Sequence, residues 1–167
     1  MEASLAIVTE TWLRDGPDLE DDIDDLLHGS GIGLITLNRE ANGQGVAHGG
    51  VAIAFRAAVV SSKKIELLPN PENYEVLTTI STISGHSRKL VTVAAYVPPG
   101  YPVAIADVVM EAKRRYREPY VVVAGDFNQW EVDKSLEDFV DIVEVGVGPT
   151  RGSSSICLLY TSPSPRD

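Results

Sequence analysis

The sequence predicts a mixed α/β (α+β) fold in which two packed β-sheets are flanked by helices. In the middle of the chain, short runs rich in Val, Ile and Thr alternate with turn residues, which is typical of strands. On both sides of this region apolar residues recur at helical spacing, and no repeat or linker divides the chain. The 167 residues, 44% of them hydrophobic, therefore fit one globular domain with its own core.

The elements are expected in the following order. A buried strand over residues 5–8 ends at Thr9-Glu10, and a helix over residues 19–27 carries acids between its apolar positions. Further strands are expected at residues 33–37, 51–55, 76–83, 90–97, 120–124 and 142–145. Helices are expected at residues 105–112, where the end is basic, and at residues 135–140.

Charge and cysteine content restrict the classes of function. A net charge of −10 argues against a polyanionic partner, but six of the eight residues from Asp18 to Asp25 are acidic, so most of the excess is local. Cys157 is the single cysteine, which excludes an internal disulfide and a cysteine-based zinc cluster. The acidic start lacks the features of a secretory signal and no run could cross a bilayer, so we expect an intracellular protein without a membrane partner. Nuclear and cytoplasmic locations are not distinguished.

Polar side chains follow two strongly apolar strands. Asp126 and Asn128 come after the strand that ends in Ala124-Gly125, and in extended geometry both point to one side while Phe127 points to the core. Glu10 ends the first strand. If the two strands are neighbours, Glu10 and Asp126 converge at one sheet edge, where oxygen ligands could hold Mg²⁺ beside a phosphate. The alternative is that Asp126 only caps a turn.

Tyr96 is a third candidate for the site. It ends a predicted strand on the same face as Thr92 and Ala94, so its hydroxyl could enter a cleft. A buried structural tyrosine is the alternative. The histidines, at positions 28, 48 and 86, all precede Asp126 and are expected in loops or at a helix end.

Taken in order, these segments resemble the endonuclease/exonuclease/phosphatase superfamily, and within it the endonuclease domains of non-LTR retrotransposons. The resemblance covers residues 5–156 and rests on five motifs: Glu10-Thr11-Trp12-Leu13, His48-Gly49-Gly50-Val51-Ala52-Ile53, Tyr96-Val97-Pro98-Pro99, Gly125-Asp126-Phe127-Asn128 and Pro149-Thr150-Arg151.

The resemblance implies a four-layer α/β/β/α sandwich of two mostly antiparallel sheets that hydrolyses phosphodiester bonds with Mg²⁺ or Mn²⁺. By motif, Glu10 would hold the metal, Tyr96 would contact the phosphate or leaving group, and Asp126 would orient or deprotonate the attacking water. Asn128 would position the nucleophile and phosphate, and Thr150 would lie near the site. In retroelements the substrate is DNA, and the nick provides a primer end for reverse transcription.

Two elements of the superfamily pattern have no counterpart here. No residue matches the N-terminal catalytic asparagine, and no histidine follows Asp126 to match the Ser-Asp-His element. We therefore expect residues 1–156 to be a partial domain that is inactive as it stands, followed at residues 157–167 by a non-native tail. Two alternatives remain: a phosphatase or phosphodiesterase of the same fold acting on small molecules or RNA, and a non-catalytic chain that binds a basic partner through residues 18–27. The oligomeric state is open.

Overall fold

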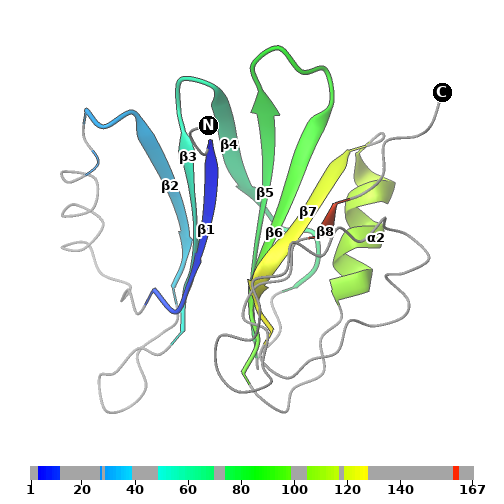
Figure 1. Cartoon of the computed structure of the whole chain (residues 1–167). Helices are drawn as coiled ribbons and strands as arrows, with labels where there is room; N and C mark the ends of the chain where they lie inside the picture. Colours follow the sequence, from blue (N-terminus) through cyan, green and yellow to red (C-terminus); the bar gives the residue numbers. More distant parts are fainter. Residues whose placement is uncertain are drawn as a thin grey trace.

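The computed structural model places two β-sheets face to face, with a helix on the outer side of the larger sheet (Figure 1). It describes residues 4–11, 27, 29–38, 49–69, 74–98, 105–116, 119–127 and 160–161. Within these ranges, no helix is long and apolar enough to cross a membrane.

The smaller sheet has three strands in the order β1-β3-β2. They are β1 (Leu5–Thr9), β2 (Ile32–Leu37) and β3 (Val51–Arg56). Both pairings are antiparallel, and Ile7 and Ile35 lie opposite Ile53 from the two sides. Because cross-strand partners share a face, the three isoleucines form one apolar row directed at the other sheet.

The larger sheet has the order β4-β5-β6-β7-β8. Its strands are β4 (Val60–Ile65), β5 (Glu75–Ile83), β6 (Lys89–Tyr96), β7 (Tyr120–Asp126) and the two-residue β8 (Tyr160–Thr161). Among the strands of the described residues, only β6 and β7 pair in parallel, and α2 (Ile105–Arg115) lies between them in sequence. A parallel pair needs such a crossover connection, which here packs on the outer face of the sheet.

Alternation along the strands divides the core into two clusters. Between the sheets, Val51, Ile53, Leu77 and Ala94 are buried, and Tyr96 packs against them. The outer face of the larger sheet packs on α2 through a second cluster, which includes Val91, Val93, Ala95, Val97, Ile105, Val108, Val109, Ala112, Val121, Val123 and Phe127. Successive residues of β6 and β7 therefore serve opposite faces.

The predicted fold class, an α/β sandwich of two mostly antiparallel sheets, is confirmed. The strands expected at residues 5–8, 33–37, 51–55, 76–83, 90–97 and 120–124 are present, as is the helix at residues 105–112. Strand β4 was not predicted, because its sequence Val-Ser-Ser-Lys-Lys-Ile has apolar residues only at its ends. The elements expected at residues 135–140 and 142–145, and all but position 27 of the segment 19–27, lie outside the described residues.

Candidate active site

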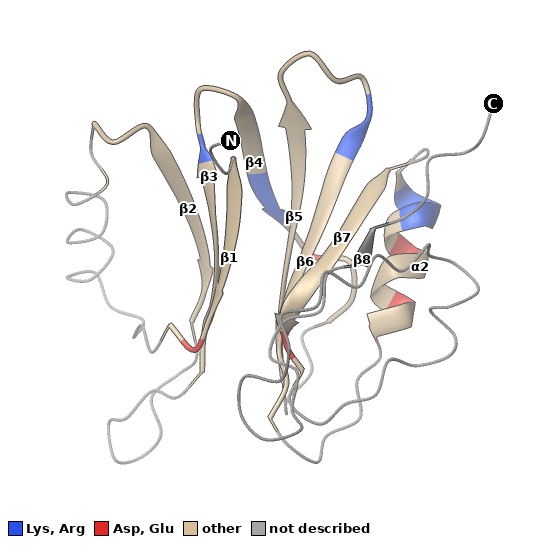
Figure 2. Cartoon of the chain, viewed as in Figure 1, with Lys and Arg blue, Asp and Glu red and all other residues tan. Residues whose placement is uncertain are grey.

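Three polar side chains form a row across one end of the larger sheet. Tyr96, the last residue of β6, lies opposite Glu75 of β5 on one side and Asp126 of β7 on the other. Cross-strand partners point to the same face, and Tyr96 packs on the cluster between the sheets, so all three face the smaller sheet. Figure 2 shows acidic residues at the lower end of both sheets and on α2. The described Lys and Arg lie along β4, toward the opposite end of the sheets and in the last turn of α2.

Glu10 approaches this row from the smaller sheet. It follows β1, and its backbone has a φ of 52°, the only positive value at a non-glycine position in the described part of the chain. A left-handed backbone costs a non-glycine residue about 1–3 kcal/mol and persists where the surroundings enforce it. Here the Tyr96 hydroxyl donates a hydrogen bond to the Glu10 carboxylate, which joins the two sheets at the site.

Glu10 and Asp126 were predicted to converge if their strands were neighbours, and these strands are not neighbours in one sheet. Strand β1 belongs to the smaller sheet and β7 to the larger one, so the two carboxylates come from opposite walls of the sandwich. They nevertheless converge, because both are close enough to Tyr96 to act on its phenol. The sequence pattern identified the correct strand ends but assigned both to one sheet edge.

The phenol of Tyr96 is strongly perturbed. Burial raises its pKa from 10.0 to about 12, and the hydrogen bond to Glu10 and the negative charges of Glu10, Asp126 and Glu75 act in the same direction. All of these effects favour the neutral form. At neutral pH Tyr96 is therefore a hydrogen-bond donor. It shares a face of β6 with Ala94, as predicted.

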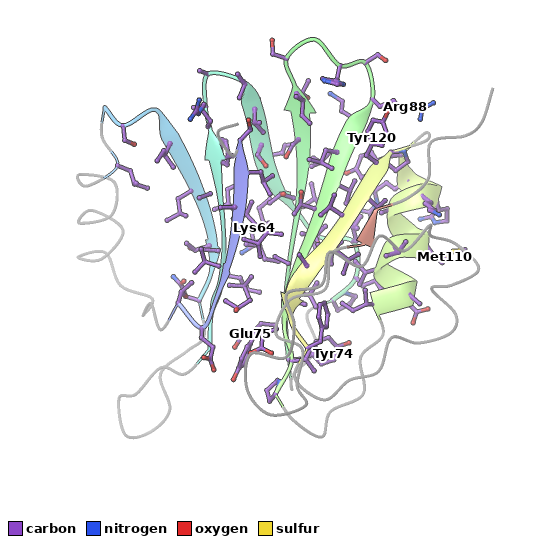
Figure 3. All side chains as sticks on the ribbon, in the orientation of Figure 1. Lys64, Tyr74, Glu75, Arg88, Met110 and Tyr120 are labelled. Carbon is purple, nitrogen blue, oxygen red and sulfur yellow. The ribbon has the colours of Figure 1, made fainter. Side chains whose placement is uncertain are left out.

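Glu75 is a site residue that the sequence analysis missed. It is 7% exposed, and in Figure 3 it lies at the lower end of the space between the sheets. Its Oε2 accepts a buried hydrogen bond of 2.7 Å from the backbone N–H of Gly50. The only signal in the sequence was an acid at the start of a strand whose alternate residues, Leu77 and Thr79, are fully buried.

The Gly125-Asp126-Phe127 motif has a local structural explanation. Gly125 has a φ of 156°, and a Cβ at this position would overlap the backbone carbonyl of Ala95 on β6. Phe127 is 1% exposed and packs in the cluster under α2, as predicted. Glycine thus lets β7 approach β6, and the buried Phe127 holds the strand end so that Asp126 faces the site.

Other predicted site residues lie outside the described residues, namely Asn128 and Thr150, as does the acidic stretch from 18 to 25.

Whether the residues near Glu10 fit the expected metal ion depends on the ligand atoms that they offer. The described residues contain no group of three His, Cys, Asp or Glu side chains that could hold an ion, but Mg²⁺ commonly uses one or two protein carboxylates and otherwise water and phosphate oxygens. Glu10 and Asp126, both oxygen donors, fit that requirement. Beside them, the buried Thr11 Oγ1 has no hydrogen-bond partner among the described residues.

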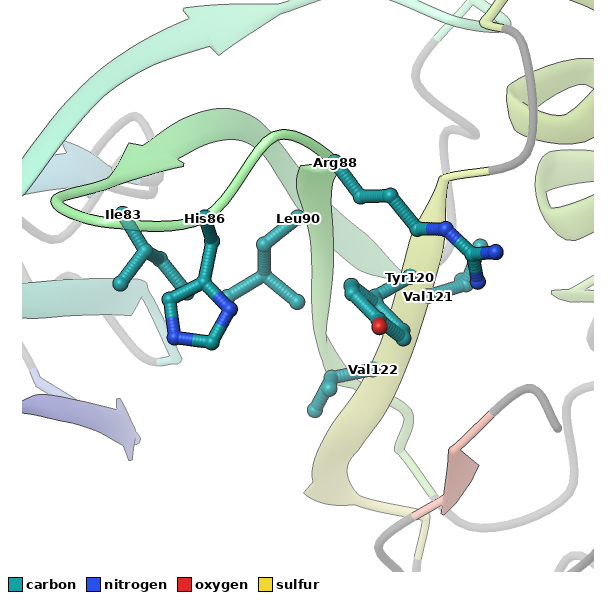
Figure 4. A pocket seen from close by; sticks show the side chains of 7 residues that line it. All are labelled: Ile83, His86, Arg88, Leu90, Tyr120, Val121 and Val122. Atoms are coloured by element: carbon teal, nitrogen blue, oxygen red, sulfur yellow. The ribbon is translucent and has the colours of Figure 1, made fainter. Parts of the chain in front are cut away.

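A cavity of about 290 Å³ lies at the other end of the larger sheet, away from this row. Figure 4 shows its lining: Ile83, His86, Arg88, Leu90, Tyr120, Val121 and Val122. The guanidinium of Arg88 sits 5.4 Å from the centre of the Tyr120 ring, a cation–π contact. Because β6 starts near this cavity and ends at Tyr96, the cavity is not the site predicted from the motifs.

Comparisons with known proteins identify the fold. No family model matches the chain, and no curated protein matches it. Among solved structures, the human Nocturnin catalytic domain with bound sulfate is similar with a TM-score of 0.68 at 12% identity, over 95% of this chain and 69% of that one. An endonuclease/exonuclease/phosphatase family protein from Leptotrichia buccalis has a TM-score of 0.56 at 10% identity, over 95% and 74% of the two chains.

The Bacteroides thetaiotaomicron mannosyl-6-phosphatase Bt3783 is also similar, with a TM-score of 0.55 at 14% identity, over 96% of this chain and 72% of that one. At such identities the likeness concerns the arrangement of the backbone. The chain therefore has the endonuclease/exonuclease/phosphatase fold.

Proposed function

We propose that this chain belongs to a phosphoesterase domain that depends on Mg²⁺ or Mn²⁺ and nicks DNA in the manner of a non-LTR retrotransposon endonuclease. The chain is inactive without the catalytic asparagine and histidine elements that none of its residues match. The observation that carries the proposal is the convergence of Glu10, Tyr96 and Asp126 from two sheets on one end of the sandwich. These three residues were selected from motifs far apart in the sequence. The choice of DNA rests on the likeness of the motifs at residues 10–13 and 96–99 to the retroelement versions.

Glu10, Tyr96 and Asp126 would each have a chemical role in phosphodiester hydrolysis. Asp126 accepts the proton of the attacking water as general base. Tyr96 is neutral because its pKa is raised to about 12. It would turn its single hydroxyl proton from Glu10 to a phosphate or leaving-group oxygen where negative charge develops. Glu10, with Asp126 beside it, would hold the divalent ion. When bound, the ion would supply electrostatic stabilisation of the phosphoryl oxygens. Asn128 and Thr150 are assigned to phosphate positioning by motif alone.

The test is nicking of supercoiled plasmid with Mg²⁺ or Mn²⁺. It is run on this chain and on a version that adds the asparagine and histidine elements found unmatched in the sequence; we expect activity in the second. Asp126→Asn and Glu10→Gln should each lower the rate by about 10²–10⁴-fold, the usual contribution of a positioned acid or base. Asp107→Asn is the control, because Asp107 is an exposed carboxylate on α2, which packs on the other face of the larger sheet. Full activity in both site variants would refute the assignment.

A second substrate class is favoured by one observation. The described Lys and Arg lie away from the end that carries Tyr96 (Figure 2), whereas duplex binding depends on cations that neutralise phosphates. A small phosphate ester, such as a sugar phosphate, needs fewer of them. Release of inorganic phosphate from a panel of small esters, lost in Asp126→Asn and without plasmid nicking, would establish this alternative.

A further inference from the structure

Glu75 is a buried carboxylate at the centre of the candidate site that the proposed mechanism does not use. Its side chain enters the space between the sheets (Figure 3), and it lies directly opposite Tyr96 in the β5–β6 register. Burying a charge is costly unless hydrogen bonds compensate it. What Glu75 contacts therefore indicates its role.

The first contact is with the glycine pair that precedes β3. The N–H of Gly50 donates to Glu75 Oε2 at 2.7 Å, and a Cβ on Gly49 would lie 2.6 Å from Oε1. Both glycines are buried, with φ of 91° and 89°, in the left-handed region that side chains disfavour. The backbone of the pair thus closes around the carboxylate.

The contacts continue from this pair to Glu10. The carbonyl of Gly50 accepts a hydrogen bond from the N–H of Thr11 at 3.3 Å, and a Cβ on Gly50 would overlap Thr11 Oγ1. Thr11 directly follows Glu10, whose positive φ turns it toward Tyr96. Since Tyr96 is the cross-strand partner of Glu75, the path returns to its start and links both sheets.

We propose that Glu75 is the positioning residue of the site: by fixing the Gly49-Gly50 backbone, and through it Thr11, it sets where the Glu10 carboxylate lies relative to Tyr96. In this role Glu75 acts through its shape and through the Oε2 atom that accepts the Gly50 N–H, rather than as a metal ligand or a general base. The inference rests on the proposed function for its catalytic meaning, but the contacts themselves do not depend on it.

Two substitutions separate position from charge. Glu75→Gln removes the charge and keeps an acceptor oxygen at the same reach, whereas Glu75→Asp keeps the charge and withdraws the acceptor by one methylene. In the version that carries the added asparagine and histidine elements, positioning predicts that the Gln variant keeps kcat within a few-fold. The Asp variant should lose about tenfold to hundredfold, the usual effect of a small misplacement, with KM little changed. A metal ligand or general base at Glu75 predicts the reverse order, and that result would overturn the proposal.

Amide hydrogen exchange provides a readout that needs no substrate and no metal. We expect the Gly50 and Thr11 amides to exchange about tenfold faster in Glu75→Asp, as for loss of one hydrogen bond, and to be nearly unchanged in Glu75→Gln. The amide of Ala57, which donates to the Gly31 carbonyl at 2.8 Å at the other end of the smaller sheet, reports any global loss of stability. Equal exchange at Gly50 in wild type and both variants would refute the positioning role. If the version that carries the added asparagine and histidine elements hydrolyses no phosphoester, the proposed function fails, and exchange alone decides the role of Glu75.

Discussion

Substitution of Gly125 by alanine tests the close pairing of β6 and β7 that places Asp126 beside Tyr96. Gly125 lies opposite Ala95 in the parallel β6–β7 pairing, one position before the Tyr96–Asp126 pair. A Cβ at Gly125 would overlap the carbonyl oxygen of Ala95 and approach its backbone N and C atoms to 2.8 Å. Because all of these atoms belong to the backbone, no side-chain rotation relieves the contact. The two strands must separate at the row that holds Asp126 beside Tyr96.

Two effects contribute to the expected cost. The backbone at a φ of 156° is strained for alanine, typically by about 1–3 kcal/mol, and forcing a methyl group into a packed site adds about 1–3 kcal/mol. Either effect is a large part of a total stability of about 5–15 kcal/mol. Gly85→Ala separates them, because Gly85 also has a positive φ, 80°, but a Cβ added there would have no atom within 4 Å. Its cost should be limited to backbone strain of about 1–2 kcal/mol.

Urea unfolding followed by circular dichroism measures both costs, and the m-value verifies that the unfolding transition stays comparable. We expect Gly125→Ala to be less stable than Gly85→Ala by about 1–3 kcal/mol, the overlap contribution. Equal stability of the two variants would mean that β6 and β7 are not in close contact at this row, and the explanation given for the glycine in the Gly-Asp-Phe-Asn motif would be wrong.

Three other predictions concern Tyr96 and the core. Because folding raises the pKa of Tyr96 from 10.0 to about 12, the unfolded chain loses the phenol proton at a lower pH than the folded chain. The stability of wild type relative to Tyr96→Phe should therefore be constant below pH 10 and should fall as the pH rises from 10 to 12. A stability difference that stays constant up to pH 12 would contradict the environment assigned to Tyr96. Thr92→Val should raise the free energy of unfolding by about 1 kcal/mol, because Thr92 Oγ1 is buried without a hydrogen-bond partner among the described residues; a lower melting temperature would reveal a partner. Phe127→Ala should cost about 3–5 kcal/mol in urea unfolding, since Phe127 is 1% exposed, and a cost below that of Gly85→Ala would place its ring outside the core.

Hydrophobic patterning predicted most strands but neither their order nor one edge strand. The runs at 51–56 and 120–126 are apolar enough to be identified alone, because burial on one or both faces leaves a direct record in residue type. Strand β4 carries Lys63 and Lys64, and lysines are common on edge strands, where they prevent association of sheets. Its weak apolar signal is thus a consequence of its place at the edge.

Strand order is set by tertiary contacts that patterning does not encode. The sequence predicts β1 and β7 as buried strands that each lead into a carboxylate, which is equally compatible with neighbours in one sheet and with opposite walls of a sandwich. In the structure β1 is only partly buried, and its Val8 is 47% exposed. The distinction arises from partners far away in sequence: β1 pairs with β3, and β7 pairs with β6 across the α2 crossover. Glu10 and Asp126 both lie near Tyr96, although they come from different sheets and not from neighbouring strands of one sheet.

Glu75 escaped prediction because its hydrogen bond to Gly50 is made to a backbone group. Motifs in a sequence record pairs of side chains, whereas the carboxylate of Glu75 binds the N–H of Gly50, a group that every residue except proline possesses. In the sequence, this contact is reflected in its other partner, the consecutive glycines Gly49 and Gly50. Both have positive φ values, and a Cβ on them would meet Glu75 and Thr11, respectively. A glycine pair before a buried strand thus indicates that something must approach the backbone closely, and here the approaching group is an acid that begins another strand. The same reasoning explains why Gly49 and Gly50 stand in a motif selected for catalysis although neither carries a functional group: their absent side chains leave the space in which Glu75 can hold Thr11, and through it Glu10, in place.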